Sequence, residues 1–235
     1  RQFRNMHELS RFPGLFEIVA GCDNDQERIN AAREVLSGCR LYSESKEFLD
    51  DPEVELVSVA TRSPDHTTHA LKALAAGKYV FLEKPIALTY TDARKLERAS
   101  VKYPGMLYFR HNRRFEPAFN HIREIIADGP LGDIYEIKLH RHGYQRRNDW
   151  QTLVECGGGQ LNNWGPHLVD HGLRLLDSPL ADVWSDLKRV AAVGDAEDLV
   201  QLVRDVDQRR ALRFQRAHDA EQGLDFVVGQ RGGGF

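Results

Sequence analysis

The sequence predicts an α/β chain in which a doubly wound parallel sheet precedes an α+β domain with an open, mostly antiparallel sheet. Two observations predict this division. Over the first hundred residues, short β-rich runs alternate with stretches whose apolar residues recur at helical spacing. After Gly105, strand-like runs follow one another with fewer helices between them. We therefore expect domains at residues 1–104 and 105–235, with the boundary near 103–105.

The elements of the first domain follow from local signals. Gly38 closes the first helical stretch and Gly77 the second, while the Tyr-Pro-Gly sequence at 103–105 stops the third. Helices joined to strands by such short connections form βαβ units, whose crossovers are right-handed. The expected strands are residues 17–22, 55–60 and 78–82, and the expected helices are residues 25–37, 66–76 and 91–102.

The second domain has a different pattern. Residues 132–142 alternate apolar and polar side chains, as a half-buried strand does. Three consecutive glycines, at 157–159, precede an expected helix over roughly residues 164–176. The other expected elements are strands at 106–110, 183–193 and 225–229 and a helix at 116–127.

Composition and charge exclude several classes of protein. The 235 residues carry 32 Lys and Arg against 35 Asp and Glu, a formal net charge of −3, which is not the basic balance of a nucleic-acid-binding protein. No apolar run approaches the roughly 20 residues of a membrane span. Cys22, Cys39 and Cys156 form no CxxC pair, which is typical of reduced thiols in a cytoplasmic protein. We expect neither nucleic acid nor membrane as a partner.

Asp23 directly follows the first expected strand. An acidic residue in this place binds the adenosine ribose hydroxyls of a dinucleotide, and a carboxylate favours NAD over NADP because it repels the 2′-phosphate. The same residue also suits a turn or helix cap within the sequence DNDQE. Asp23 is therefore a candidate cofactor-binding residue with a structural alternative.

Two polar loops follow the next two expected strands, at residues 61–69 and 83–85. Ligands of doubly wound sheets bind beyond the carboxyl ends of the strands, so these loops are expected to line a nicotinamide cofactor. The candidate cofactor-binding residues in them are Thr61, Ser63, Pro64, His69, Glu83 and Lys84.

A dinucleotide-binding unit also carries a GxGxxG turn about 20 residues before its acidic residue. Counting back from Asp23 reaches the first residues, RQFRN, which contain no glycine. We expect either that the first strand and its glycine turn lie upstream of this sequence, or that the chain never had them.

The run SPDHTTHALKALAAGKYVFLEKPIALT, residues 63–89, resembles a segment of the glucose–fructose oxidoreductase/inositol dehydrogenase/rhizopine-catabolism (Gfo/Idh/MocA) family. The match includes the family's Glu-Lys-Pro at 83–85, directly after an AGK-headed apolar strand. The resemblance implies a Rossmann domain, a second domain whose sheet supports a homo-oligomer, and NAD(P)-dependent oxidoreduction of sugars or polyols. It covers residues 12–176 well and thins beyond 182, and further strands are expected after the closing FVVGQRGGGF.

A second family signature is a glycine run followed by a helix that carries the catalytic histidine. By the resemblance, His167 is that histidine, and Asn163 stands where the family usually has Asp. A histidine base can remove a hydroxyl proton, and Lys84 can supply the cation that stabilises the developing alkoxide. Asn163 could orient a hydroxyl but could not take up a proton, so acid–base work would fall on His167 with Lys84.

Several of these positions have structural alternatives. Asn163 also suits the N-cap of a helix that starts at residue 164, and Asp170 either orients His167 or pairs with Arg174. Arg113 is equally compatible with a surface ion pair, and Trp150 with a place in the core. The candidate substrate contacts are Arg113, Trp150, Asn163 and Asp170.

Three other functions remain open. The chain could be a family member that keeps the fold and the oligomer interface but has no activity. The absent glycine turn, and Asn163 in place of Asp, favour this interpretation. A glycosidase or lyase that oxidises its sugar transiently and recycles NAD would use the same residues. A metal-dependent enzyme would use His167 and His171, whose i, i+4 spacing is compatible with metal ligation. No third ligand has an obvious place, although His140 and His142 lie on a nearby expected strand, and we expect no metal.

Overall fold

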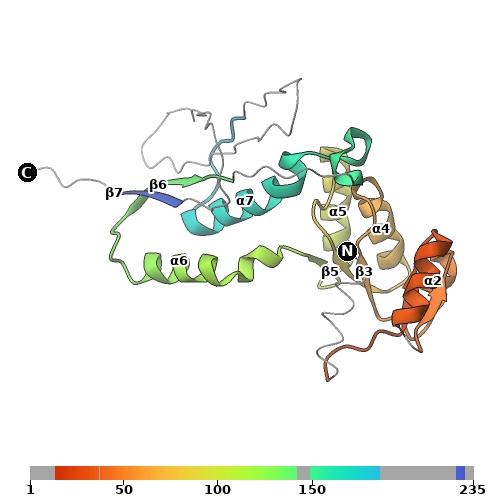
Figure 1. Cartoon of the computed structure of the whole chain (residues 1–235). Coiled ribbons are helices and arrows are strands. Elements are labelled where there is room, and N and C mark those ends of the chain that lie inside the picture. The colour runs from red at the N-terminus through yellow and green to blue at the C-terminus, as the bar shows by residue number, and fades with distance from the viewer. Residues whose placement is uncertain (1–13, 37, 142–148, 186–225, 231–235) are drawn as a thin grey trace, which may run out of the picture. The chain divides into compact units, whose positions relative to one another are not determined.

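The computed structural model describes residues 14–36, 38–141, 149–185 and 226–230. The chain divides into two compact units, Arg1–Arg110 and His111–Phe235. Figure 1 labels several elements of each unit, among them α4 and α5 of the first and α6 and α7 of the second.

The strands of the first unit are all parallel. β1 (Ala20–Cys22) pairs with β2 (Arg40–Tyr42), while β3 (Leu56–Val59), β4 (Tyr79–Leu82) and β5 (Leu107–Phe109) form a three-stranded sheet in that order. The intervening helices are α2 (Gln26–Val35), α3 (Ser45–Asp50), the short η1 (Ser63–Asp65), α4 (His66–Ala75) and α5 (Tyr90–Lys102). This parallel α/β arrangement confirms the predicted fold class of the first half.

Capping and turn residues explain where these helices begin and end. The side chain of Asp25 accepts hydrogen bonds from the backbone N–H groups of Glu27 and Arg28 at the start of α2, and Thr89 caps α5 in the same way. Gly77 has φ of +75° just after α4, a conformation that glycine adopts without steric cost. The chain can therefore turn directly from α4 into β4.

The core of the first unit lies between β3–β5 and helices α4 and α5. Alternate strand residues such as Val57, Val59, Val80 and Leu82 are buried, as the two-residue period of a strand requires. α4 and α5 contribute the buried Ala70, Ala73, Leu74, Leu96 and Ala99. This packing fixes the sheet edge at which the loops after β3 and β4 emerge.

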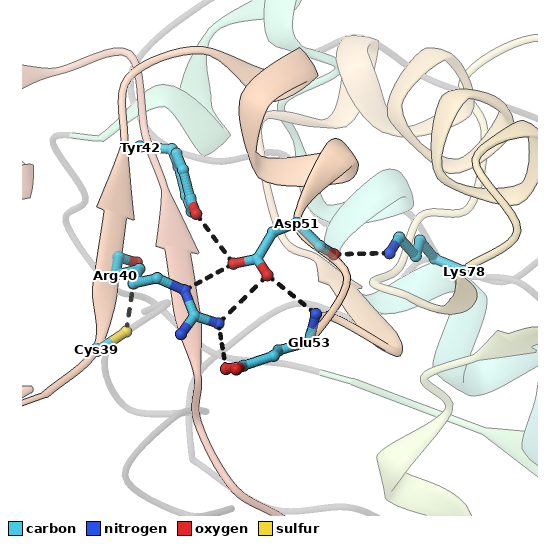
Figure 2. A network of polar contacts seen from close by, with 6 residues as sticks. All are labelled: Cys39, Arg40, Tyr42, Asp51, Glu53 and Lys78. Carbon is cyan, nitrogen blue, oxygen red and sulfur yellow. Dashed lines mark hydrogen bonds and ion pairs between the residues drawn. The ribbon is translucent and has the colours of Figure 1, made fainter.

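β2 and α3 are elements that the sequence analysis missed. Their segment is held by the buried carboxylate of Asp51, which accepts hydrogen bonds from Arg40 Nε at 2.8 Å, the Tyr42 hydroxyl at 3.0 Å and Glu53 N at 3.0 Å (Figure 2). Lys78 Nζ donates to the Asp51 carbonyl oxygen at 2.8 Å. A three-residue strand anchored by charge has no apolar alternation that would reveal it.

β5 belongs to the first unit because it pairs with β4 along Val80↔Leu107, Phe81↔Tyr108 and Leu82↔Phe109. The expected strand at 106–110 is therefore present, but the chain divides after Arg110 rather than near 103–105. The Tyr-Pro-Gly turn marks the end of α5 and not the end of the unit.

The second unit is α+β. β6 (Ile134–Leu139) pairs antiparallel with β7 (Phe226–Gln230), which agrees with the strands expected at 132–142 and 225–229. Phe119, Ile137, Leu139, Leu168 and Leu175 form its core. The other elements are the short helices η2 (Asn112–Phe115), η3 (Trp150–Thr152) and η4 (Val154–Cys156), with α6 (Pro117–Ala127) and α7 (Gln160–Leu176).

Two expectations for this unit need comment. α7 begins at Gln160, before the expected start at 164, because Gly159 and not Asn163 is its N-cap. Residues 183–185, the start of an expected strand at 183–193, have no regular structure, and the rest of that range lies outside the described residues. Among the described residues, no helix combines the length and apolar character needed to cross a bilayer.

Candidate functional site

The loops after β3 and β4 are neighbours because these two strands pair in parallel register. The backbone N–H of Glu83 donates to the carbonyl oxygen of Val59 at 3.0 Å, so the ladder continues to the point where both loops begin. Thr61 and Ser63 lie in the first loop, and Glu83 and Lys84 in the second. The structure thus places these four predicted cofactor residues at one edge of one sheet. Pro64 follows Ser63 in the same loop and is exposed.

His66 joins the two loops. Its ring is 1% exposed, with Nδ1 2.7 Å from the carbonyl oxygen of Pro85 and Nε2 3.0 Å from that of Thr61. Carbonyl oxygens only accept hydrogen bonds, so the ring donates from whichever nitrogen carries a proton. The sequence analysis chose His69, which is only half-buried, and missed His66. Burial lowers the pKa of His69, with the nearby Asp65 opposing this effect.

Glu83 and Lys84 are both half-buried at the start of the loop after β4. Glu83 forms an ion pair with Arg110, which follows β5, and accepts a hydrogen bond from the backbone N–H of Lys84 at 3.3 Å. The side chain of Lys84 is half-buried. The Glu83–Arg110 pair therefore ties the residue before Lys84 to the neighbouring strand.

Asp23 lies at the end of β1, as expected. One carboxylate oxygen accepts a hydrogen bond from the backbone N–H of Asp25 at 3.0 Å, and the other lies 3.5 Å from the guanidinium of Arg28. The side chain is 17% exposed. Asp23 thus shapes the turn before α2 while presenting a carboxylate at a strand end, so its two predicted roles are compatible.

The glycine run sets the start of α7. Gly157 and Gly159 have φ of +67° and +112°. A Cβ on Gly158 would lie 2.6 Å from both Gln151 O and Leu153 N, closer than packed atoms approach. The glycines thus let η3 and η4 pack directly against the entry to α7. Trp150, a predicted substrate contact, is half-buried at the start of η3, and its role stays a prediction.

His167 is buried within α7, 5% exposed. Its ring meets those of Trp164 and His111 edge-to-face, with centroids 6.0 and 6.4 Å away. Asn163 is half-buried one turn earlier, and its backbone N–H donates to Gly159 O at 3.1 Å. Asn163 and His167 are four residues apart on α7 and therefore share one face of the helix, and Asn163 does not cap the helix.

Asp170 is fixed by arginine from the η2 segment. Arg114 donates to both carboxylate oxygens, from Nε at 2.7 Å and from Nη2 at 2.5 Å, while Arg174 lies 3.6 Å away. Burial would raise the pKa of Asp170, but the hydrogen bonds from Arg114 and attraction to His111 hold it below its usual value. Asp170 thus fastens α7 to η2, and through the helix it positions His167.

Two further histidines lie in this unit, the buried His171 and the half-buried His111. His171 stacks on Phe119 with centroids 4.0 Å apart, and its Nε2 lies 3.1 Å from Arg113 O, so it donates there. Burial lowers the pKa of both His171 and His111. Within the described part of the chain, no three His, Cys, Asp or Glu side chains form a group that could hold a metal ion; His142 lies outside it.

Comparisons with known proteins match both units. Residues 2–111 match a family model described as "Oxidoreductase family, NAD-binding Rossmann fold", and residues 119–228 match one described as "GFO/IDH/MocA C-terminal domain". An NAD-binding protein from Listeria innocua has a similar solved structure, with a TM-score of 0.67 and 28% identity, covering 74% of this chain and 52% of that one.

Two curated relatives are dehydrogenases. scyllo-Inositol 2-dehydrogenase (NADP(+)) IolW of Bacillus subtilis (strain 168) is 30% identical over 173 residues, which cover 73% of this chain and 48% of IolW. D-Glucoside 3-dehydrogenase of Escherichia coli (strain K12) is 30% identical over 166 residues, covering 69% of this chain and 47% of that enzyme. The chain spans about half the length of these relatives.

Proposed function

Because the chain belongs to the Gfo/Idh/MocA oxidoreductase family, we propose that the protein transfers a hydride between a nicotinamide cofactor and a secondary hydroxyl of a sugar or polyol. The observation that carries this proposal is the second unit's buried His167, held on α7 behind a glycine run that tolerates no side chain at Gly158. The names of IolW and D-glucoside 3-dehydrogenase support polyols and sugars as the substrate class.

The first unit supplies the cofactor half of the proposal. The carboxylate of Asp23 at the end of β1 suits the ribose hydroxyls of an adenosine, and the loops after β3 and β4 suit the nicotinamide. These residues fit NAD(H). Arg28 beside Asp23 could also bind the 2′-phosphate of NADP(H), the cofactor named for IolW. When bound, the nicotinamide accepts the hydride from the carbon that carries the hydroxyl.

The chain's own residues manage the proton and the charge. In the oxidising direction His167 removes the hydroxyl proton, so that the oxygen becomes a carbonyl as the hydride leaves. Lys84 stabilises the negative charge that develops on that oxygen. Asn163 orients the hydroxyl by hydrogen bonding through its side-chain amide. The amide cannot take up the proton, so that step falls to His167. Arg113, Trp150 and Asp170 stay proposed as contacts or supports of the substrate.

A family member without activity is the second candidate, and Asn163 is the observation that favours it. If an acid at this position were required for proton transfer, its amide would abolish turnover while leaving the fold intact. We also propose a cytoplasmic protein that forms a homo-oligomer through the sheet that contains β6.

NAD+ reduction at 340 nm over a panel of sugars and polyols tests the proposal. The panel includes scyllo-inositol, D-glucose and methyl D-glucoside. We expect at least one substrate to be oxidised, and we expect replacement of His167 by Asn to lower kcat by about 100-fold or more, the usual contribution of a general base. If Asn163→Asp creates activity that the natural protein lacks, the second candidate is correct.

A further inference from the structure

Two arginines from different elements lie over one tryptophan of the second unit. The guanidinium carbon of Arg113, in η2, is 4.0 Å from the ring centroid of Trp164. That of Arg141, which follows β6, is 3.8 Å from the same centroid. Three half-buried side chains thus form an Arg–Trp–Arg stack.

The positive charge of this stack is only partly neutralised. Glu116 forms an ion pair with Arg113, whereas Arg141 has no carboxylate partner among the described residues. Burial, and repulsion from Arg141, lower the pKa of Arg113 despite the attraction of Glu116. Among the described residues, two like charges therefore lie against one tryptophan, and one carboxylate pairs with one of them.

Stacking leaves Arg141 able to bind an anion. A guanidinium over an aromatic ring makes contact through its face, and its five N–H donors lie in its own plane, where they match the two oxygens of a carboxylate or phosphate. No hydrogen bond uses these donors within the part of the chain that the structure describes. The ring of Trp164 gives the group a fixed place.

The stack lies beside the proposed catalytic histidine. Trp164 precedes His167 by three residues on α7, and their rings meet edge-to-face with centroids 6.0 Å apart. Arg141 and His167 both lie against the ring of Trp164, so an anion bound by Arg141 would lie near the hydroxyl on which His167 is proposed to act.

We propose that Arg141, with Arg113, is an anion subsite, so that the substrate is a sugar acid or sugar phosphate more than a neutral sugar. This inference rests on the proposed function for the reaction itself, but anion binding at the stack can be measured without turnover.

Calorimetric titration with D-glucose, D-glucuronate and D-glucose 6-phosphate tests the subsite. The natural protein is compared with Arg141→Gln, with Arg141→Lys, which keeps the charge but loses the planar fork, and with Arg123→Gln. Arg123 is an exposed arginine of α6, so its variant removes the same charge elsewhere in the unit. Circular dichroism checks that each variant is folded.

We expect one or both anionic sugars to bind at least tenfold more tightly than D-glucose. That advantage should disappear in Arg141→Gln, persist in part in Arg141→Lys and remain in Arg123→Gln. Preference for D-glucuronate alone would identify a carboxylate as the ligand group, and preference for the phosphate alone a phosphate.

Equal or absent binding of the three sugars, or equal losses in the Arg141 and Arg123 variants, would overturn the subsite. Oxidation of D-glucose with no preference for its anionic derivatives would overturn the subsite and leave the proposed function intact. Anion binding that depends on Arg141, with no NADH formed from any sugar, would support the subsite and count against the proposed function.

Discussion

Two buried histidines, His66 and His171, hydrogen-bond backbone carbonyl groups. His66 connects Thr61 and Pro85, and His171 donates to the carbonyl oxygen of Arg113. Each therefore fixes a loop that carries residues of the candidate site. A buried carbonyl oxygen that loses its donor costs about 1–3 kcal/mol, so these contacts matter for both stability and geometry.

His66→Ala is expected to lower the free energy of unfolding by about 1–3 kcal/mol, because it removes the N–H that the ring donates to one of the two carbonyl oxygens and opens a small cavity. It should also weaken NADH binding, since the loop of Lys84 loses its tie to the loop of Thr61. Urea unfolding and NADH fluorescence measure the two effects. Lys72→Ala, at an exposed position of the same helix, is the control. An equal effect of the two variants on NADH binding would refute the positioning role of His66.

Stability should fall as the pH decreases below neutrality. The pKa values of His111 and His171 lie below the ordinary value of 6.5, chiefly through burial, so the unfolded chain binds their protons more readily. The contribution of these two histidines to the free energy of unfolding is complete above pH 6.5. It is lost as the pH falls through their lowered pKa values in the folded protein. Urea unfolding at a series of pH values should give a flatter profile for His171→Gln than for the natural protein. Identical slopes would show that His171 titrates normally.

At the scale of elements, the close approach of residues 151 and 153 to Gly158 shapes the entry to α7, the helix that carries His167. The close contact at Gly158 is with backbone atoms of Gln151 and Leu153, which cannot swing aside as a long side chain can. The Asp170–Arg114 pair then fastens the middle of the helix to η2. α7 is thus held at its start and at its centre, with His167 between these points.

Gly158→Ala is expected to destabilise the protein by about 1–3 kcal/mol, the usual cost of overpacking, and to reduce kcat because α7 shifts. Thermal unfolding and steady-state kinetics provide the measurements. At Gly14 an added Cβ meets nothing within 4 Å, so Gly14→Ala should change the unfolding free energy by less than about 0.5 kcal/mol. A Gly158→Ala variant as stable and active as Gly14→Ala would show that the loop adjusts without cost.

At the scale of the whole molecule, sequence alone predicted most elements of both units. Alternating strands and capped helices leave clear local patterns, so β3, α4, β4 and α5 lie close to their expected bounds. The short β2 and α3 were missed because they depend on the charged contacts of Asp51. The sequence analysis placed the boundary near residues 103–105, whereas the units divide after Arg110. β5 belongs to the first unit because it pairs with β4, and this pairing leaves no local pattern in the sequence.

The same limit applies to the site. Lys84 and His167 could be found from motifs, whereas His66 bonds carbonyl groups 5 and 19 residues away in the sequence. The Arg–Trp–Arg stack likewise joins three separate elements. A pattern along the chain cannot reveal partners that only folding brings together.

Titration of the purified protein with NADH, followed by cofactor fluorescence, tests the central claim most directly. We expect saturable binding in the micromolar range, with NADH preferred to NADPH because Asp23 presents a carboxylate at the end of β1. Absence of binding up to millimolar NADH and NADPH, in a protein shown to be folded by circular dichroism, would contradict the claim that this chain works as a nicotinamide-dependent oxidoreductase.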